Sequence, residues 1–184
     1  MPVITEGFKQ ALANLPPWEL HKIIIKFARK NREFYDYINL EYLVKKEVET
    51  DLFEETKEAV FSALYSNYRG NLQKQLKSGI DKASKHINYF VKITKNKKLE
   101  ADLLLMMLDY IFSNFSQYLG TCFTVFDSKL AITTNRLYNL VTKKLHEDYI
   151  IDYEGDINRF LEILHSRSNQ LDYVFSMPKK VNKD

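Results

Sequence analysis

Glycine and proline are scarce in this chain, and their scarcity excludes several classes of protein. The 184 residues include 5 Gly and 4 Pro, together about 5% of the chain where average usage is roughly 12%. A fold of many short strands needs turn residues about every 8–12 positions, and this sequence cannot supply them. The glycines are never closer than nine residues apart, which excludes the glycine-rich loops that bind dinucleotides or nucleotide phosphates.

Cysteine and long apolar runs are also lacking. The single cysteine, Cys122, cannot form an intramolecular disulfide, which fits a reducing compartment. The most apolar run, residues 103–112, is interrupted by Asp109 and is far shorter than the roughly 20 residues that span a bilayer. The first residues lack the basic and apolar regions of a signal peptide. We therefore expect a soluble, cytoplasmic protein with no membrane partner.

Apolar residues recur at three- and four-residue spacing nearly throughout, which predicts an all-α fold. Pro17 is placed to begin a helix; Asn31, Asp51 and Asp156 are predicted as N-caps, and Gly120 as a C-cap. Gly70 is expected to break the chain before the next helix. The predicted helices cover about residues 17–30, 31–42, 51–68, 71–94, 98–119 and 128–146, and a last long helix begins at about residue 156.

Few residues separate successive helices, so we expect antiparallel helical hairpins packed as a multi-helix layered or short solenoid-like domain. The helix at 98–119 is apolar nearly all round and is predicted to lie at the centre. We expect a single domain over residues 1–178, followed by a frayed basic tail at 179–184.

Charge is distributed unevenly along the chain, although the net charge is only +3. Residues 47–58 carry six acidic side chains and one basic, a net of −5. Residues 69–98 carry nine basic and one acidic, a net of +8, and residues 147–162 again carry −5. This acidic, basic, acidic order predicts surfaces of opposite sign.

Five lysines of the basic segment fall within an arc of about 80° on the predicted helix at 71–94, over about 32 Å. We call them the lysine face: Lys74, Lys77, Lys85, Lys92 and Lys95. Such a row can contact an acidic protein, a second copy of the chain, a nucleic-acid backbone or a membrane surface. It can equally be an ordinary solvated helix face, or be neutralised by the acidic segments.

The sequence offers few candidates for catalysis or metal binding. Glu162 and His165 form one Glu-x-x-His pair, whereas carboxylate-bridged di-iron bundles need two such pairs and two further glutamates. Cys122 lies among apolar neighbours, as a structural thiol does, without the electropositive setting of a nucleophile. We expect no catalytic residues, no metal site and no cofactor.

Residues 15–38, with the sequence LPPWELHKIIIKFARKNREFYDYI, resemble the opening helix pair of an uncharacterised bacterial family of small helical proteins, a domain of unknown function. Residues 101–111 and 128–138 resemble its second half in kind and order. The resemblance spans roughly residues 15–165 and implies an all-α fold and a bacterial, cytoplasmic setting. It implies no catalytic residue.

Two functions remain open at this point. The first is a non-catalytic helical scaffold that binds another protein or a second copy of itself. The second is electrostatic binding of nucleic acid through the lysine face. An enzyme is the least favoured reading.

Overall fold

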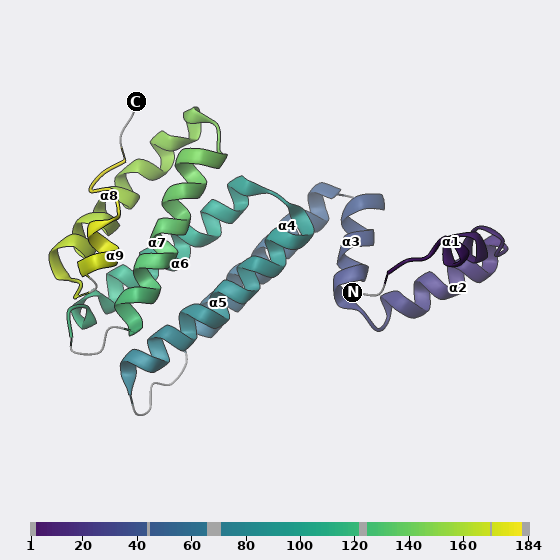
Figure 1. Ribbon diagram of the computed structural model, residues 1–184, viewed down its shortest axis with the longest axis horizontal. Coiled ribbons are helices and arrows are strands. Elements are labelled where there is room, and N and C mark those ends of the chain that lie inside the picture. Colours follow the sequence, from purple (N-terminus) through teal and green to yellow (C-terminus); the bar gives the residue numbers. More distant parts are fainter. Residues whose placement is uncertain (1–2, 44, 66–70, 122–124, 170, 182–184) are drawn as a thin grey trace. The chain divides into compact units, whose positions relative to one another are not determined.

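The computed structural model describes residues 3–43, 45–65, 71–121, 125–169 and 171–181, and every regular element in these ranges is a helix (Figure 1). The prediction of an all-α fold is therefore confirmed. The chain divides into two compact units, residues 1–49 and residues 50–184, where the sequence predicts one domain. Gly70 and Cys122 lie outside the described residues.

The first unit holds three short helices and the start of a fourth. These are α1 (Glu6–Ala13), α2 (Pro17–Ala28), α3 (Arg32–Tyr42) and the first turn of α4 (Lys45–Leu64). Pro17 begins α2, and the Asn31 side chain accepts a hydrogen bond from Phe34 N at 3.1 Å, so both of these predicted helix starts are confirmed. The Phe27 and Phe34 rings meet edge to face at 4.9 Å and join α2 to α3.

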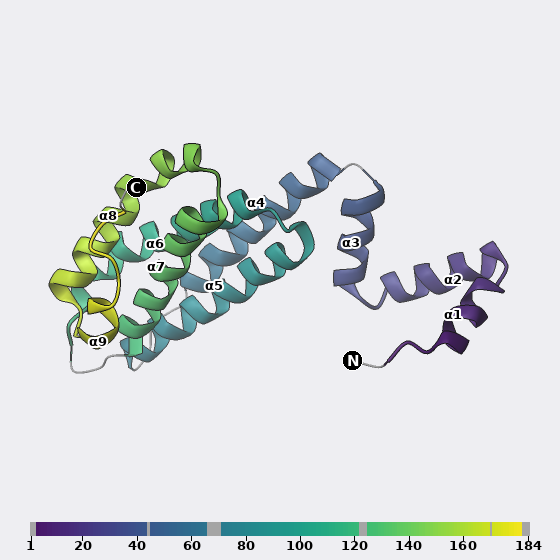
Figure 2. The ribbon, with the colours of Figure 1, turned by 45° about the horizontal axis from the view of Figure 1, so that its top comes forward.

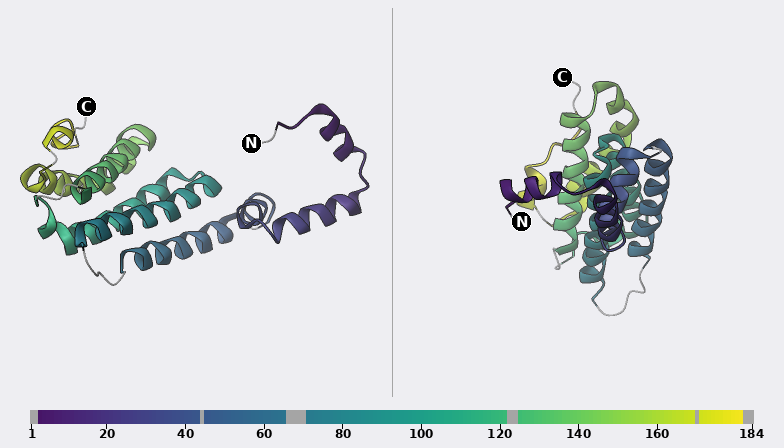
Figure 3. Two further views of the ribbon diagram at one scale, coloured as in Figure 1. Left: turned by 60° about the horizontal axis from the view of Figure 1, so that its bottom comes forward. Right: turned by 90° about the vertical axis from the view of Figure 1, so that its right-hand side faces the viewer.

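The second unit is a packed helical bundle made of hairpins. After α4 come α5 (Leu72–Thr94), α6 (Lys97–Phe115), α7 (Val125–Lys144), α8 (Ile150–Arg167) and the short α9 (Leu171–Phe175). Single 3₁₀ turns, η1 (Ser116–Tyr118) and η2 (Glu147–Tyr149), precede α7 and α8. Figure 2 shows α6, α7 and α8 beside one another, and Figure 3 shows α5 running back along α4.

The centre of this bundle is shared by α6 and α7. Helix α6, predicted as central, packs against α5, α7 and α8, while α7 contacts α5, α6, α8 and α9. The Phe112 and Phe160 rings stack between α6 and α8 at 4.6 Å, and both are buried. Six apolar residues of α5 and α8 are fully buried: Ile80, Ile87, Phe90, Ile157, Phe160 and Leu164.

Gly79 lies where the backbone of α5 comes near that of α4. A Cβ at this position would lie 3.2 Å from the Ala63 carbonyl oxygen, tighter than ordinary van der Waals contact. Gly79 therefore has a packing role inside α5, since it lets two helix backbones come together.

A buried carboxylate fastens the segment between α6 and α7 to the end of α8. Asp127 Oδ2 accepts hydrogen bonds from Gly120 N at 3.1 Å, Ser168 Oγ at 3.1 Å and Asn169 N at 3.0 Å. Gly120 has φ +75°, and a Cβ there would lie within 2.3 Å of the Arg167 carbonyl oxygen. Gly120 therefore follows η1 in the left-handed conformation, five residues beyond Phe115, the last residue of the α6 helix that Gly120 was expected to cap.

Two predicted N-caps are wrong because the helices begin earlier than the apolar pattern indicates. Asp51 lies inside α4, which starts at Lys45, and Asp156 lies inside α8, which starts at Ile150. The sequence predicts a frayed tail at 179–184, but the described part of this tail, up to residue 181, is packed at its end. Val181 is buried, and its N–H donates to Asn158 Oδ1 at 2.7 Å.

Candidate interaction surfaces

The lysine face lies on the outer side of α5. Helix α5 begins where the Asn71 side chain accepts from Lys74 N, and its apolar side packs into the bundle. All five lysines of the face, Lys74, Lys77, Lys85, Lys92 and Lys95, are exposed. The acidic segments of the second unit therefore leave this face open to solvent.

One carboxylate interrupts the lysine face. Asp81 lies 2.5 Å from Lys77 Nζ and 2.7 Å from Lys129 Nζ of α7. Burial opposes ionisation of Asp81, but hydrogen bonds from the two lysines outweigh it and lower the pKa of this carboxyl. Lys77 is therefore partly neutralised, and Asp81 ties α5 to α7.

The structure changes the outline of the face at one end. Helix α5 ends at Thr94, and Lys95 takes a left-handed conformation with φ 56°, so Lys95 does not follow the helical arc from which it was predicted. Lys82, which the 80° arc omitted, is also exposed and lies beside Lys85 in helical phase. A wider arc drawn from the sequence finds it.

Large apolar side chains gather on the surface of the first unit. Helices α1 and α2 bury no residue. Among the described residues, twelve large apolar side chains are exposed within residues 3–43, against six within residues 50–181. The twelve are Val3, Ile4, Phe8, Trp18, Ile23, Ile24, Ile25, Phe27, Tyr35, Tyr37, Tyr42 and Leu43.

Two rows within this set follow the helical period. Ile23, Ile24 and Phe27 share one side of α2, and Tyr35 and Tyr42 share one side of α3. We call these five residues the α2–α3 surface. Both rows belong to the helical apolar spacing of the sequence, but that spacing alone could not show that their side chains are exposed.

Cationic side chains flank the apolar row of α2. A shallow groove of about 460 Å³ runs along the helix, lined by Ile25 and four cations: Lys22, Lys26, Arg29 and Lys30. Lys22 Nζ lies over the Trp18 ring, 4.5 Å from its centroid. By helical phase Lys26 lies about 60° from Ile23, so cationic side chains border the apolar row on one exposed helix.

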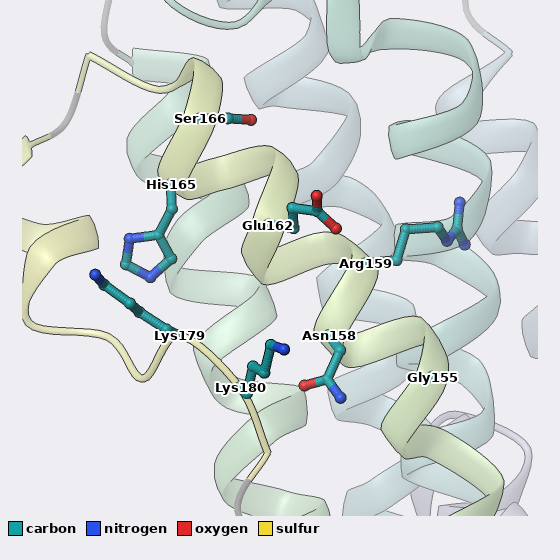
Figure 4. Close-up of a pocket in the computed structure, with 8 residues that line it drawn as sticks. All are labelled: Gly155, Asn158, Arg159, Glu162, His165, Ser166, Lys179 and Lys180. Atoms are coloured by element: carbon teal, nitrogen blue, oxygen red, sulfur yellow. The ribbon is translucent and has the colours of Figure 1, made fainter.

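A polar groove of about 670 Å³ lies between α8 and the C-terminal segment (Figure 4). Lys179 and Lys180 border it, and Arg159 points away from them toward its partners Asp109 and Asp156. Burial opposes the charge of Arg159, but the two carboxylates raise its pKa. Arg159 therefore acts as a structural cation that joins α8 to α6.

The Glu-x-x-His pair borders the same groove. His165 Nε2 lies 3.2 Å from the Pro178 carbonyl oxygen, and Ser166 Oγ donates to the Ile163 carbonyl oxygen. His165 therefore contacts the C-terminal segment. Within the described ranges, no three His, Cys, Asp or Glu side chains are grouped as metal ligands are.

No helix in the described part of the chain is both long and apolar enough to cross a membrane. No family model, curated protein or solved structure matches this chain. The resemblance to a bacterial helical family therefore stays a prediction.

Proposed function

We propose that this chain is a non-catalytic helical interaction protein. The bundle of residues 50–184 serves as the scaffold, and the helices of the first unit carry the contact surface. The observation that carries the proposal is the set of exposed large apolar side chains within residues 3–43.

The physical reason lies in the shortness of the exposed helices. Helices α1 and α2 have 8 and 12 residues and bury none of them. Helices of this length are marginal in water unless an amphipathic face is packed, and large exposed apolar patches mark contact sites. A partner that covers this face stabilises both helices by about 25 cal/mol for each Å² of apolar surface buried.

Site-specific photo-crosslinking in cells of the protein's own source tests this function. A photoreactive residue replaces Ile23, and a matched variant carries it at Ile132 on α7, which is exposed to the same degree (48% and 49%). We expect a discrete crosslinked protein, either a different chain or the same one, from position 23 only. No crosslink from position 23, or equal crosslinking from both positions, contradicts the proposal.

Nucleic-acid binding is the second candidate function, and the exposure of all five lysines of the lysine face favours it. If about four lysines contact phosphates, the logarithm of the binding constant falls against log salt with a slope near −3.5. We expect Lys85→Glu/Lys92→Glu to abolish binding in a gel shift. The control Lys143→Glu/Lys144→Glu makes the same charge change at exposed positions of α7. Absence of binding at low salt, or equal loss in the control, ends this candidate.

A further inference from the structure

We infer that the α2–α3 surface pairs with the same surface of a second copy of this chain, in a two-fold symmetric contact. The inference rests on the proposed function and names its partner. Three observations carry it: the apolar rows, the area that they offer and the charges that border them.

The apolar rows lie on two helices that already pack together. Ile23 and Phe27 on α2 and Tyr35 on α3 are about half exposed, and Tyr42 on α3 is 70% exposed. The Phe27–Phe34 contact at 4.9 Å joins the two helices. A second helix pair that packs on these rows therefore forms a small four-helix arrangement, in which each pair covers the other.

The exposed area suits an ordinary dimer interface. A half-exposed large side chain presents roughly 100 Å², since a buried aromatic contributes about 150–250 Å². The five residues of the α2–α3 surface then offer about 500 Å² of apolar area per copy. Because interfaces are a little over half apolar, the whole contact is about 900 Å² per copy, close to the standard size.

The charges of the first unit are self-complementary, as a two-fold contact requires. Residues 17–32 carry five basic side chains and one acidic, a net of +4. Residues 33–49 carry five acidic and two basic, a net of −3. In an antiparallel pair, the basic half of one copy faces the acidic half of the other, with exposed Lys26 and Lys30 opposite exposed Glu41 and Glu47.

The same charge pattern disfavours other occupants. An anionic membrane attracts residues 17–32 but repels residues 33–49 of the same unit, which carry a net of −3. A wholly acidic protein surface meets the same repulsion. A second copy of the chain places opposite charge against both residues 17–32 and residues 33–49.

Sedimentation velocity over about 1–200 µM tests the contact on the full chain. We expect a reversible monomer–dimer equilibrium, with a dissociation constant raised at least about tenfold by Ile23→Glu. The matched control, Ile132→Glu, leaves it unchanged. Far-UV circular dichroism of each variant checks that its helices are retained.

A charge-swap pair keeps the inference testable even if Ile23→Glu perturbs α2. We expect Lys26→Glu/Lys30→Glu and Glu41→Lys/Glu47→Lys each to weaken self-association, and an equimolar mixture of the two variants to form a heterodimer. A mixture no tighter than either variant alone overturns the inference, as does a chain that stays monomeric to 200 µM. Binding of that monomer to vesicles of phosphatidylglycerol also overturns it.

The two proposals fail separately. If the chain is monomeric and crosslinks from position 23 to a different protein, the inferred pairing with a second copy is overturned and the interaction function is supported. A monomeric chain with no crosslink overturns both.

Discussion

The two units of this molecule have the same kind of sequence pattern but differ in whether its apolar residues are buried. Both have apolar residues at helical spacing, but those of residues 50–184 are buried in a shared core, whereas those of residues 3–43 are largely exposed. Phe160 on α8 is fully buried, while Phe27 on α2 is half exposed. Periodicity therefore identifies a helix and its apolar side, but it does not say which surface covers that side.

Ion pairs in this molecule are of two kinds. Within residues 50–184, some join separate helices: Arg136 reaches Glu100 at 2.7 Å, and Arg159 reaches Asp109 at 2.6 Å, while others, such as Lys98–Asp102, are local. In the first unit, the pairs Lys9–Glu6 and Arg32–Asp36 are local, three and four residues apart. Local pairs support single helices by a few tenths of a kcal/mol, whereas pairs between helices also fix their packing.

The largest expected difference between the units is in core substitutions. We expect Phe160→Ala to lower the free energy of unfolding of the bundle by about 3–5 kcal/mol, because the stacked contact with Phe112 is replaced by a cavity. Phe27→Ala should change it by less than about 1 kcal/mol, since that ring is already half in water. Urea unfolding measured by far-UV circular dichroism gives both values.

Trp18 supplies a separate probe for the first unit, because it is the only tryptophan and lies on α2. In urea, Trp18 emission should report the unfolding of the first unit in the Phe27→Ala variant. It should not report the loss of stability in Phe160→Ala, because that loss lies in the bundle. Equal losses of stability in the two variants would contradict the contrast between a buried and an exposed apolar face.

Glycine substitutions sharpen the contrast within the bundle itself. We expect Gly120→Ala to destabilise by about 2–4 kcal/mol, because φ is +75° and the new Cβ meets the Arg167 carbonyl oxygen. Gly155→Ala should stabilise by about 0.5–1 kcal/mol, since Gly155 lies inside α8 and nothing lies within 4 Å of a Cβ there. Thermal unfolding of both variants measures the difference. A tolerated Gly120→Ala would contradict the left-handed conformation of Gly120 and its close approach to the Arg167 carbonyl oxygen.

The sequence predicted the helices well where an apolar period and a strong cap coincide. Asn31 and Asn71 cap α3 and α5 as asparagine does at helix starts. Asp51 and Asp156 misled because aspartate, a common cap, also occurs inside helices: their helices begin six residues earlier, at Lys45 and Ile150. Tyr149, which precedes α8, makes no side-chain capping hydrogen bond.

The candidate surfaces were predictable in part. The lysine face follows from helical phase alone, apart from Lys95, whose left-handed backbone a sequence period cannot show. The exposure of Ile23 and Phe27 depends on what tertiary packing leaves uncovered. Asp127 accepts hydrogen bonds from Ser168 and Asn169, which follow it by 41 and 42 positions in the sequence. A local sequence pattern cannot predict such a contact.

The smallest expected effect concerns Asp81, which ties α5 to α7 through Lys129. Because its pKa is lowered in the folded chain, its contribution to stability is present above the unfolded value of 3.8 and is lost as pH falls through the folded pKa. We expect Asp81→Asn to cost on the order of 1 kcal/mol or less at pH 7, since the pair is partly exposed. The difference in the free energy of unfolding between the native chain and this variant should shrink below about pH 4.

Urea unfolding between pH 3 and 7 measures this difference, with Asp51→Asn, an exposed position on α4, as the control. Trp18 emission from the first unit should be the same in both proteins at every pH. A difference in stability that stays constant down to pH 3 would show that the ion pair is not what joins α5 to α7.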